Sequence, residues 1–151
     1  MTQGFLYDYY RSLIFQLRRG NYRGAVSNAK PMYLYLLIVK IGAGEIEGNR
    51  IFFDKELIHD YKIAQNFFHC KKKAPLSEPY YFLATDKFYH LKWRDEPIKN
   101  DSPSAKFIRD NIEYAYFDNA LWDLLLDENV RKEYCSVLLQ RYMILHTLQQ
   151  K

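Results

Sequence analysis

The residues from Asn28 to Glu45, NAKPMYLYLLIVKIGAGE, constrain the fold more than any other stretch. Between positions 32 and 39 no side chain is charged or strongly polar. A helix that is apolar on all sides has no face for water, so this pattern predicts a buried central helix. Pro31 suits the first turn of that helix, and Gly42 or Gly44 supplies its end. With about ten apolar residues, against the roughly twenty that span a bilayer, it is too short to cross a membrane.

Apolar spacing elsewhere predicts further helices and a few strands. The expected helices are 5–19, 54–70 with Asp54 as its cap, 104–111, 118–126 and 129–148. The expected strands are 50–53, 113–117, and a β-hairpin of 80–84 and 88–93 around a turn at 85–87. A chain of 151 residues fits one domain. We therefore expect a mostly helical α+β fold, a single domain over residues 1–151, around the buried central helix and with a small antiparallel sheet.

The two cysteines and the N-terminal residues bear on the cellular compartment. Cys70 and Cys135 belong to no CxxC or Cys/His pattern, which is typical of reduced thiols in a cytoplasmic protein. The N-terminus shows no basic stretch followed by an apolar run and a small-residue cleavage site, so we expect no secretory signal. These features predict a cytoplasmic location and no membrane partner.

No residue pattern indicates catalysis. The histidines, at positions 59, 69, 90 and 146, are scattered, whereas a His-dependent metal nuclease needs them clustered. Asp60-Tyr61-Lys62 matches the D-x-K fragment of a Mg²⁺-dependent nuclease, but it falls on a predicted helix and lacks an upstream Pro-Asp. The glycines of IGAGE do not follow a strand, so they form no nucleotide-binding fingerprint. We therefore expect no enzyme, and no catalytic residue, metal ligand or cofactor.

Charge is distributed unevenly along the chain. Residues 1–100 carry 16 basic and 10 acidic side chains, whereas residues 101–151 carry 6 and 8. Two intervals, 9–44 and 61–77, contain several basic residues and no acid. A basic run is often only a solvated surface, but this asymmetry also favours a side that faces a polyanion.

The head of the central helix is the best candidate for a polyanion site. A helix N-terminus offers free N–H groups and a partial positive charge, both of which suit a phosphate. Lys30 stands beside this end, and Ser27 or Asn28 can cap it. If the SEPYY segment folds next to it, the result is a basic, aromatic-lined groove suited to a nucleic-acid backbone. The candidates for backbone contact are Arg19, Tyr22, Arg23, Lys71, Lys72 and Lys73.

Four segments occur in an order that carries a family resemblance. They are AKPMYLYLLIVKI, GEIEGNRIFFDKELI, EPYYFLATDKFYHLKW and YAYFDNALWDLLLDENVRKEYCSVLLQRYM. Over residues 22–143 the chain resembles the sulfur-binding domain found in front of HNH nuclease domains in phosphorothioate-dependent restriction enzymes. The resemblance implies binding to double-stranded DNA in which sulfur replaces a non-bridging phosphate oxygen.

The resemblance also implies which residues form the site. In this family a proline with aromatic neighbours lines an apolar pocket, beside a basic residue at the head of the core helix. Sulfur is larger and less well hydrated than oxygen, so it loses less by entering such a pocket. By motif match the proline is Pro79 and the basic residue is Lys30. Glu78 stands where family members commonly carry an aromatic residue, and its carboxylate repels a phosphate unless it points away or binds a base amino group. The full candidate set for DNA and sulfur contact is Asn28, Lys30, Pro31, Glu78, Pro79, Tyr80 and Tyr81.

We therefore expect a non-catalytic DNA-binding module that recognises phosphorothioated DNA. The matched segments include no HNH nuclease motif, so any nuclease activity would come from a separate domain or partner chain. An alternative stays open from composition alone. The 14 tyrosines could form a tyrosine-rich contact surface, and the protein would then be a protein-interaction or oligomerisation module, for example a homodimer.

Overall fold

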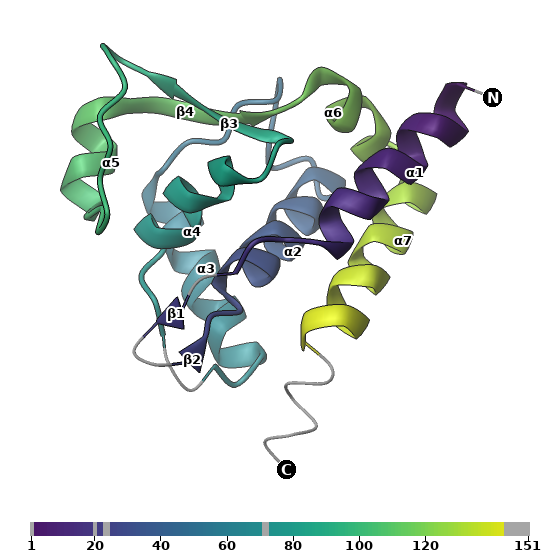
Figure 1. Cartoon of the computed structure of the whole chain (residues 1–151), viewed down its shortest axis with the longest axis horizontal. Coiled ribbons are helices and arrows are strands. Elements are labelled where there is room, and N and C mark those ends of the chain that lie inside the picture. The colour runs from purple at the N-terminus through teal and green to yellow at the C-terminus, as the bar shows by residue number, and fades with distance from the viewer. Residues whose placement is uncertain (1, 20, 23–24, 71–72, 144–151) are drawn as a thin grey trace.

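The computed structural model describes residues 2–19, 21–22, 25–70 and 73–143. Within these ranges it confirms the predicted fold class, a mostly helical α+β arrangement with little sheet (Figure 1). The helices are α1 (Thr2–Phe15), α2 (Ala29–Gly42), α3 (Lys55–Phe67), α4 (Ser77–Phe82), α5 (Ala105–Asn111), α6 (Asn119–Leu125) and α7 (Glu128–Leu138), with short helical turns η1 (Leu83–Thr85) and η2 (Leu139–Met143). The strands of these ranges form two antiparallel pairs, β1 (Asn21–Tyr22) with β2 (Ala25–Val26), and β3 (Tyr89–Trp93) with β4 (Ile112–Phe117).

The predicted central helix is confirmed as α2, which packs against α3, α4, α6 and α7 (Figure 1). Leu34, Leu37 and Ile38 are completely buried on it. The helix ends where the Ala43 N–H donates to the Val39 carbonyl, and Gly44 follows with a φ of +76°. Glycine adopts this conformation at little steric cost, so the chain can turn away towards α3.

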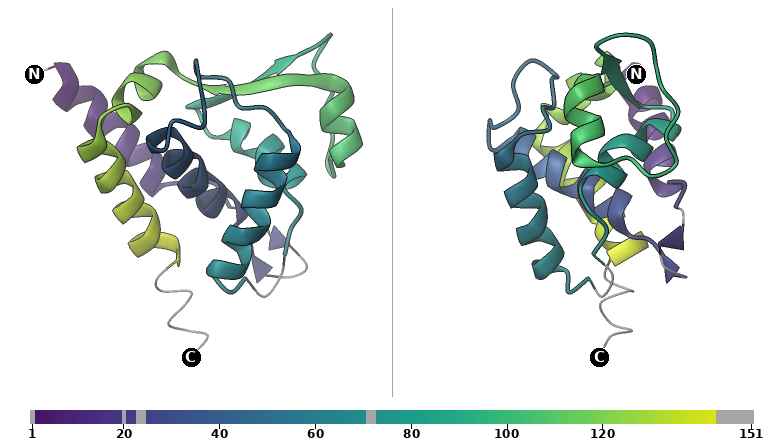
Figure 2. Two further views of the ribbon diagram at one scale, coloured as in Figure 1. Left: turned by 180° about the vertical axis from the view of Figure 1, so that it is seen from behind. Right: turned by 90° about the vertical axis from the view of Figure 1, so that its left-hand side faces the viewer.

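Helices α1 and α7 lie side by side at one end of the molecule, and β3 and β4 lie at the other (Figure 2). The first pair is joined by tyrosines. The Tyr134 hydroxyl donates to the Tyr7 carbonyl at 2.8 Å, and the two rings stack with their centroids 5.3 Å apart. The Tyr142 hydroxyl, from η2, donates to the carbonyls at the end of α1.

The predicted hairpin of 80–84 and 88–93 is wrong in its first half. Residues 80–84 are helical, in α4 and η1, and β3 pairs with β4 instead, with Tyr89 opposite Phe117. An apolar run without alternation suits a short buried helix as well as a strand, and Pro79 is tolerated in the first turn of a helix. Packing against α2 then selects the helix.

Other boundaries differ at the ends of elements. The predicted strand 50–53 is reduced to a single bridge between Ile51 and Ala115. Helix α1 lies about one turn nearer the N-terminus than the predicted 5–19, and the last part of the predicted helix 129–148 falls outside the described residues. Asp54 caps α3 as predicted, since its side chain accepts from the Leu57 N–H at 2.9 Å. No helix in the described ranges is long and apolar enough to cross a membrane.

Many of the tyrosines serve the core. Among the described residues seven are buried, namely Tyr10, Tyr33, Tyr61, Tyr80, Tyr89, Tyr134 and Tyr142. Buried hydroxyls need partners, and the Tyr89 hydroxyl donates to the Tyr80 carbonyl at 2.7 Å while lying 3.0 Å from the Tyr33 hydroxyl. Among the described tyrosine side chains only Tyr9 is largely exposed. The remaining tyrosines with described side chains, apart from Tyr9, are half-buried, so the alternative of a tyrosine-rich contact surface stays a prediction.

Candidate functional site

A cavity of about 450 Å³ lies at the head of α2. Lys30, from the head of a helix, and Pro79, from a distant segment, were predicted from the sequence to meet at one site, and both line this cavity. The full lining is Arg18, Arg19, Ser27, Ala29, Lys30, Ala74, Glu78, Pro79, Phe82, Thr85 and Asp101. Four separate parts of the chain therefore converge here.

The apolar part of the lining comes from helix α4 and two alanines. Pro79 and Phe82 are three residues apart, so the helix presents both on one face. The other two predicted aromatic residues are carried elsewhere by the same geometry. Tyr80 is fully buried in the core, where its hydroxyl donates to the Ile51 carbonyl at 2.7 Å. Tyr81 packs against Trp93 and donates to the Ile98 carbonyl, so neither lines the cavity.

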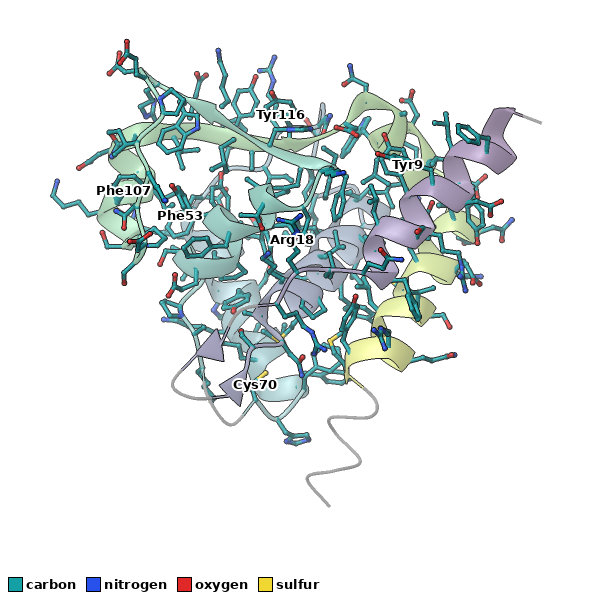
Figure 3. All side chains as sticks on the ribbon, viewed as in Figure 1. Tyr9, Arg18, Phe53, Cys70, Phe107 and Tyr116 are labelled. Atoms are coloured by element: carbon teal, nitrogen blue, oxygen red, sulfur yellow. The ribbon has the colours of Figure 1, made fainter. Side chains whose placement is uncertain are left out.

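Two arginines supply uncompensated positive charge. Arg18 and Arg19 are exposed, and among the described residues neither guanidinium pairs with an acid. Arg19 instead donates to the Asn28 side-chain oxygen at 2.8 Å and lies over the Tyr142 ring at 4.9 Å. Arg18 (labelled in Figure 3) is held by its backbone, whose N–H donates to the Asp86 carboxylate at 2.9 Å. Both charges are left available for an anion.

The sequence predicts a basic Lys30 that is free to bind an anion, but in the structure Lys30 is paired with an acid. Its ammonium donates to the Asp86 carboxylate and to the Thr85 hydroxyl, each at 2.9 Å. The two charged side chains are 11% and 6% exposed. An ion pair this enclosed is largely neutral to an incoming phosphate, because the carboxylate offsets the ammonium. Lys30 therefore fastens the head of α2 to η1 at the wall of the cavity.

The N-terminus of α2 has few free donors. The Ser27 hydroxyl accepts from the Ala29 N–H at 3.1 Å, and the Asn28 carbonyl accepts from the Met32 N–H at 3.1 Å, whereas the Asn28 side chain makes no capping bond. Pro31 has no N–H and is buried in the core without lining the cavity. The arginines, and not the helix end, are accordingly the main source of attraction for an anion at this site.

Glu78 brings a carboxylate to the same cavity. Its Oε2 atom is enclosed and has no hydrogen-bond partner among the described residues. Burial raises the pKa of this carboxyl above its ordinary value of 4.5. The group therefore opposes an anion when it is ionised and ceases to do so when it is protonated.

Several predicted residues lie away from the cavity. Lys73 is exposed and donates to the Asn66 side-chain oxygen at 2.7 Å. Arg23, Lys71 and Lys72 lie outside the described residues, as does the side chain of Tyr22. Some lining residues were not predicted from the sequence. Arg18 could have been, because it adjoins Arg19 in an acid-free interval. Phe82, Thr85 and Asp101 could not, because they reach the cavity through the helical path of α4 and through tertiary folding, which no local sequence pattern indicates.

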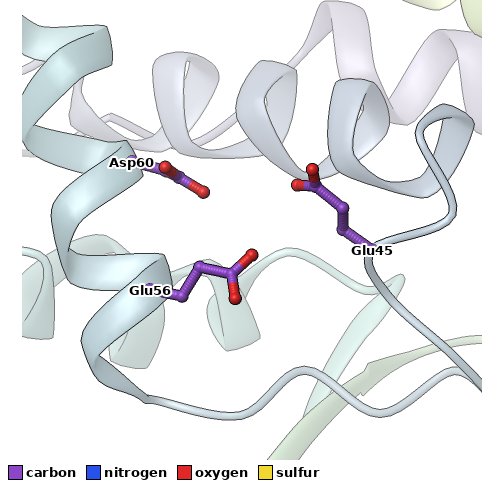
Figure 4. A group of neighbouring side chains, drawn as sticks. All are labelled: Glu45, Glu56 and Asp60. Atoms are coloured by element: carbon purple, nitrogen blue, oxygen red, sulfur yellow. The ribbon is translucent and has the colours of Figure 1, made fainter.

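A second group of charged residues lies between α2 and α3 (Figure 4). Glu45, Glu56 and Asp60 each offer a carboxylate oxygen within 4.8 Å of the others. The buried Lys40 ammonium donates to all three, at 3.1 Å to Glu45, at 3.5 Å to Glu56, and to Asp60. Burial alone lowers the pKa of Lys40, but its bonds to Asp60 and Glu45 outweigh burial and raise it. The ammonium fills the space a metal ion would need, so the cluster serves to hold a buried lysine.

Comparison with known proteins identifies no relative: no family model matches the chain, and a search of curated proteins gives no match. The case for a function therefore rests on the chemistry of the cavity at the head of α2.

Proposed function

We propose that this protein is a non-catalytic DNA-binding module that recognises a phosphorothioated backbone. One observation carries the proposal. A cavity walled by Pro79 and Phe82 is also lined by two arginines that form no ion pair with a described acid, although Glu78 and Asp101 line the same cavity. Charge beside the cavity attracts a phosphate diester, and the apolar wall favours the less hydrated sulfur over oxygen.

In this proposal each part of the cavity has a separate task. Arg18 and Arg19 bind the backbone oxygens and supply affinity for any DNA, because charge attracts phosphate irrespective of sequence. Pro79 and Phe82 contact the sulfur. An ordinary phosphate oxygen in the same place loses its water and finds no donor on this wall, which penalises unmodified DNA.

The proposed partner is double-stranded DNA in the cytoplasm. The family resemblance further supports a nuclease on a separate chain that this module would direct to modified DNA. Neither partner contributes to the cavity, so binding to DNA can be measured with this chain alone.

The test compares two duplexes of one sequence, one of which carries a single phosphorothioate. Fluorescence anisotropy at about 50 and 200 mM salt should show tighter binding of the sulfur duplex by about tenfold. Log affinity should fall with log salt at about −0.9 for each phosphate contacted. Equal affinity for both duplexes would remove the sulfur claim, and binding to neither would remove the DNA claim.

Variants separate the two tasks. Arg18→Ala or Arg19→Ala should weaken both duplexes equally, by roughly three- to tenfold, because a phosphate contact carries no information about sulfur. Pro79→Ala should instead reduce the preference for sulfur. Arg11→Ala is the matched control, since Arg11 lies in the same acid-free interval but is paired with Glu133 at 3.2 Å. Equal effects of Arg11 and Arg18 would contradict the assignment.

A second candidate function is self-association. Three apolar side chains are exposed beside a groove of about 330 Å³ between α2 and α3, namely Val39 at 48%, Ile63 at 54% and Phe67 at 71%. Apolar side chains that gather at one groove are typical of protein interfaces. A molecular mass that rises with concentration, returns to that of the monomer in Ile63→Glu, and accompanies no DNA binding would favour this function.

A further inference from the structure

A second cavity, of about 700 Å³, adjoins the first and has no role in the proposed function. It lies between helix α3, the segment 73–77 and the segment 102–105. Ala74 lines both cavities, so the two share a wall. A hollow of this size is typical of small-molecule sites, which occupy about 300–1,000 Å³.

The charge of this second cavity favours an anion. Lys62 and Lys73 line it, and no acidic residue does. The Lys73 ammonium donates to the neutral Asn66 amide at 2.7 Å, which leaves its charge uncompensated. Lys62 is exposed on α3 and has no acidic partner among the described residues. The Arg109 guanidinium adds a third positive charge nearby, 5.7 Å from the centre of the Phe53 ring.

The remaining walls combine apolar surface with hydrogen-bonding groups. Phe53, Ile58 and Leu76 provide the apolar part. Gln65 is buried, and its amide nitrogen is fixed by donation to the Ala74 carbonyl at 2.8 Å. Its side-chain oxygen then has no partner among the described residues and is left as an acceptor facing a cavity that also holds the hydroxyl of Ser77.

These properties together select a class of ligand. A lipid tail would gain nothing from the amide and hydroxyl groups, and inorganic phosphate would gain nothing from the apolar wall. An anion with a flat ring that has both apolar faces and a hydrogen-bonding edge uses all of them. Nucleotides have this chemistry, since the phosphate is anionic and the base edge carries donors and acceptors.

We propose that the second cavity binds a nucleotide, with the phosphate at Lys62 and Lys73 and the base between Phe53 and Gln65. The nucleotide is either free or part of a DNA strand whose neighbouring phosphate lies in the first cavity. Both sources present the same groups. Lys62, Lys73, Phe53 and Gln65 do not line the first cavity, so binding of a free nucleotide stands or falls separately from the proposed function, whereas binding of a strand across both cavities rests on it.

The test uses the intact protein with two probes, deoxyadenosine monophosphate and a short single-stranded oligonucleotide, each titrated by calorimetry and by amide NMR spectra. At least one probe should bind and should shift amide signals of residues 61–66 and 73–77. Deoxyadenosine and inorganic phosphate, tested separately, should each bind about tenfold more weakly than the nucleotide, since each lacks one half of the contacts. Binding of the monophosphate indicates a free nucleotide, whereas binding of the oligonucleotide alone indicates a strand.

Two lysines of one helix provide a matched comparison. Lys62→Ala should weaken the bound probe by about tenfold, as expected for loss of a charged contact. Lys55→Ala removes the same charge from an exposed position of α3 that does not line the cavity, and should leave binding unchanged. Gln65→Leu should weaken the nucleotide more than inorganic phosphate. Binding of neither probe, or equal loss in the Lys62 and Lys55 variants, overturns the inference.

The failure of one site is distinguishable from the failure of the other. Arg18→Ala should retain binding of a free nucleotide in the second cavity and should weaken a bound strand only through its neighbouring phosphate, whereas Lys62→Ala should retain the preference for sulfur over oxygen. A circular dichroism spectrum and an unfolding midpoint that match those of the parent protein show that each variant is folded.

Discussion

Glu78 holds one carboxylate oxygen in an enclosed position at the cavity, without a hydrogen-bond donor among the described residues. A buried acceptor that lacks a partner costs folding free energy, and more when it is charged. Because burial raises its pKa above 4.5, folding favours the protonated form. The stability contributed by this group is therefore fully present below pH 4.5 and is lost as pH rises through the higher value of the folded state.

Glu78→Gln should accordingly stabilise the protein at pH 7 by about 1 kcal/mol, because the amide carries no charge. The difference from the parent protein should shrink near pH 4, where the parent's own carboxyl is protonated. Urea denaturation at both pH values measures this. A variant that is no more stable at pH 7, or a difference that grows on acidification, would contradict the account of Glu78.

Lys40 is a second residue whose charge affects the stability of the fold. Its ammonium is buried, and it is surrounded by Glu45, Glu56 and Asp60. Lys40→Met leaves these carboxylates facing one another without a cation, and it should cost about 2 kcal/mol of unfolding free energy, less than for a fully buried pair because the acids are partly exposed. Lys55→Met, the same change at an exposed position of that region, is the control. Equal effects of the two changes in urea denaturation would refute the role given to Lys40.

Among the elements, α4 shows which features of the site could be predicted from the sequence and which could not. The motif match selected Pro79 and Lys30, and both line one cavity. It also assigned Tyr80 and Tyr81 to that cavity, as the aromatic neighbours of Pro79, but the helical path of α4 turns both away from it. Whether the apolar run 80–84 becomes strand or helix depends on packing against α2, which lies far away in sequence. The partner of Lys30, Asp86, was hidden for the same reason.

The central helix was predictable because its evidence is local. An apolar run with a proline near its start and glycines after its end specifies a buried helix without reference to anything else. By contrast, the burial of Lys40 could not be predicted, because two of its three acidic partners come from α3. The polar residues that determine the charge of these sites are mostly of this kind, since their partners come from distant parts of the chain.

Helix α4 is joined to the segment before α3 by one hydrogen bond from a buried tyrosine. Tyr80→Phe removes the hydroxyl that donates to the Ile51 carbonyl at 2.7 Å. The change should lower the unfolding free energy by about 1 kcal/mol, the usual net value of one buried hydrogen bond. Tyr81→Phe loses a bond to the Ile98 carbonyl and one from the Asn100 N–H, but both groups of that loop are nearer to water and can bond to it instead, so the change should cost less. Urea denaturation should give a lower unfolding midpoint for Tyr80→Phe than for Tyr81→Phe. The reverse order would contradict the role given to the Tyr80 hydroxyl.

For the molecule as a whole, buried tyrosines predict a limit at alkaline pH. Burial raises the pKa of Tyr33 and of Tyr89 well above the ordinary value of 10.0. Their contribution to stability is present below pH 10.0, where the unfolded chain keeps its protons, and is lost above it, as the unfolded state releases protons that the folded state retains. The raised pKa of Lys40 acts in the same direction.

The unfolding free energy should therefore fall steeply between about pH 10 and pH 12. Urea denaturation at steps across this range measures the fall, and the absorbance of tyrosinate provides a second reading. Ionisation of the buried tyrosines should appear together with unfolding. The tyrosines outside the core ionise in the folded protein as well, so a stability that stays constant through this range, or ionisation of every tyrosine before unfolding, would contradict the burial of these hydroxyls.

The whole-molecule claim is that distant segments meet in a cavity which prefers sulfur to oxygen on a DNA backbone. The phosphorus of a phosphorothioate is chiral, so a cavity with one apolar wall can contact the sulfur in only one of the two configurations. The most direct measurement is the affinity of the protein for three duplexes that differ at one phosphate, with sulfur in each configuration and with oxygen. We predict that one sulfur configuration binds about tenfold more tightly than the other two duplexes, and that Pro79→Ala removes the difference. Equal affinity for all three would contradict the proposal.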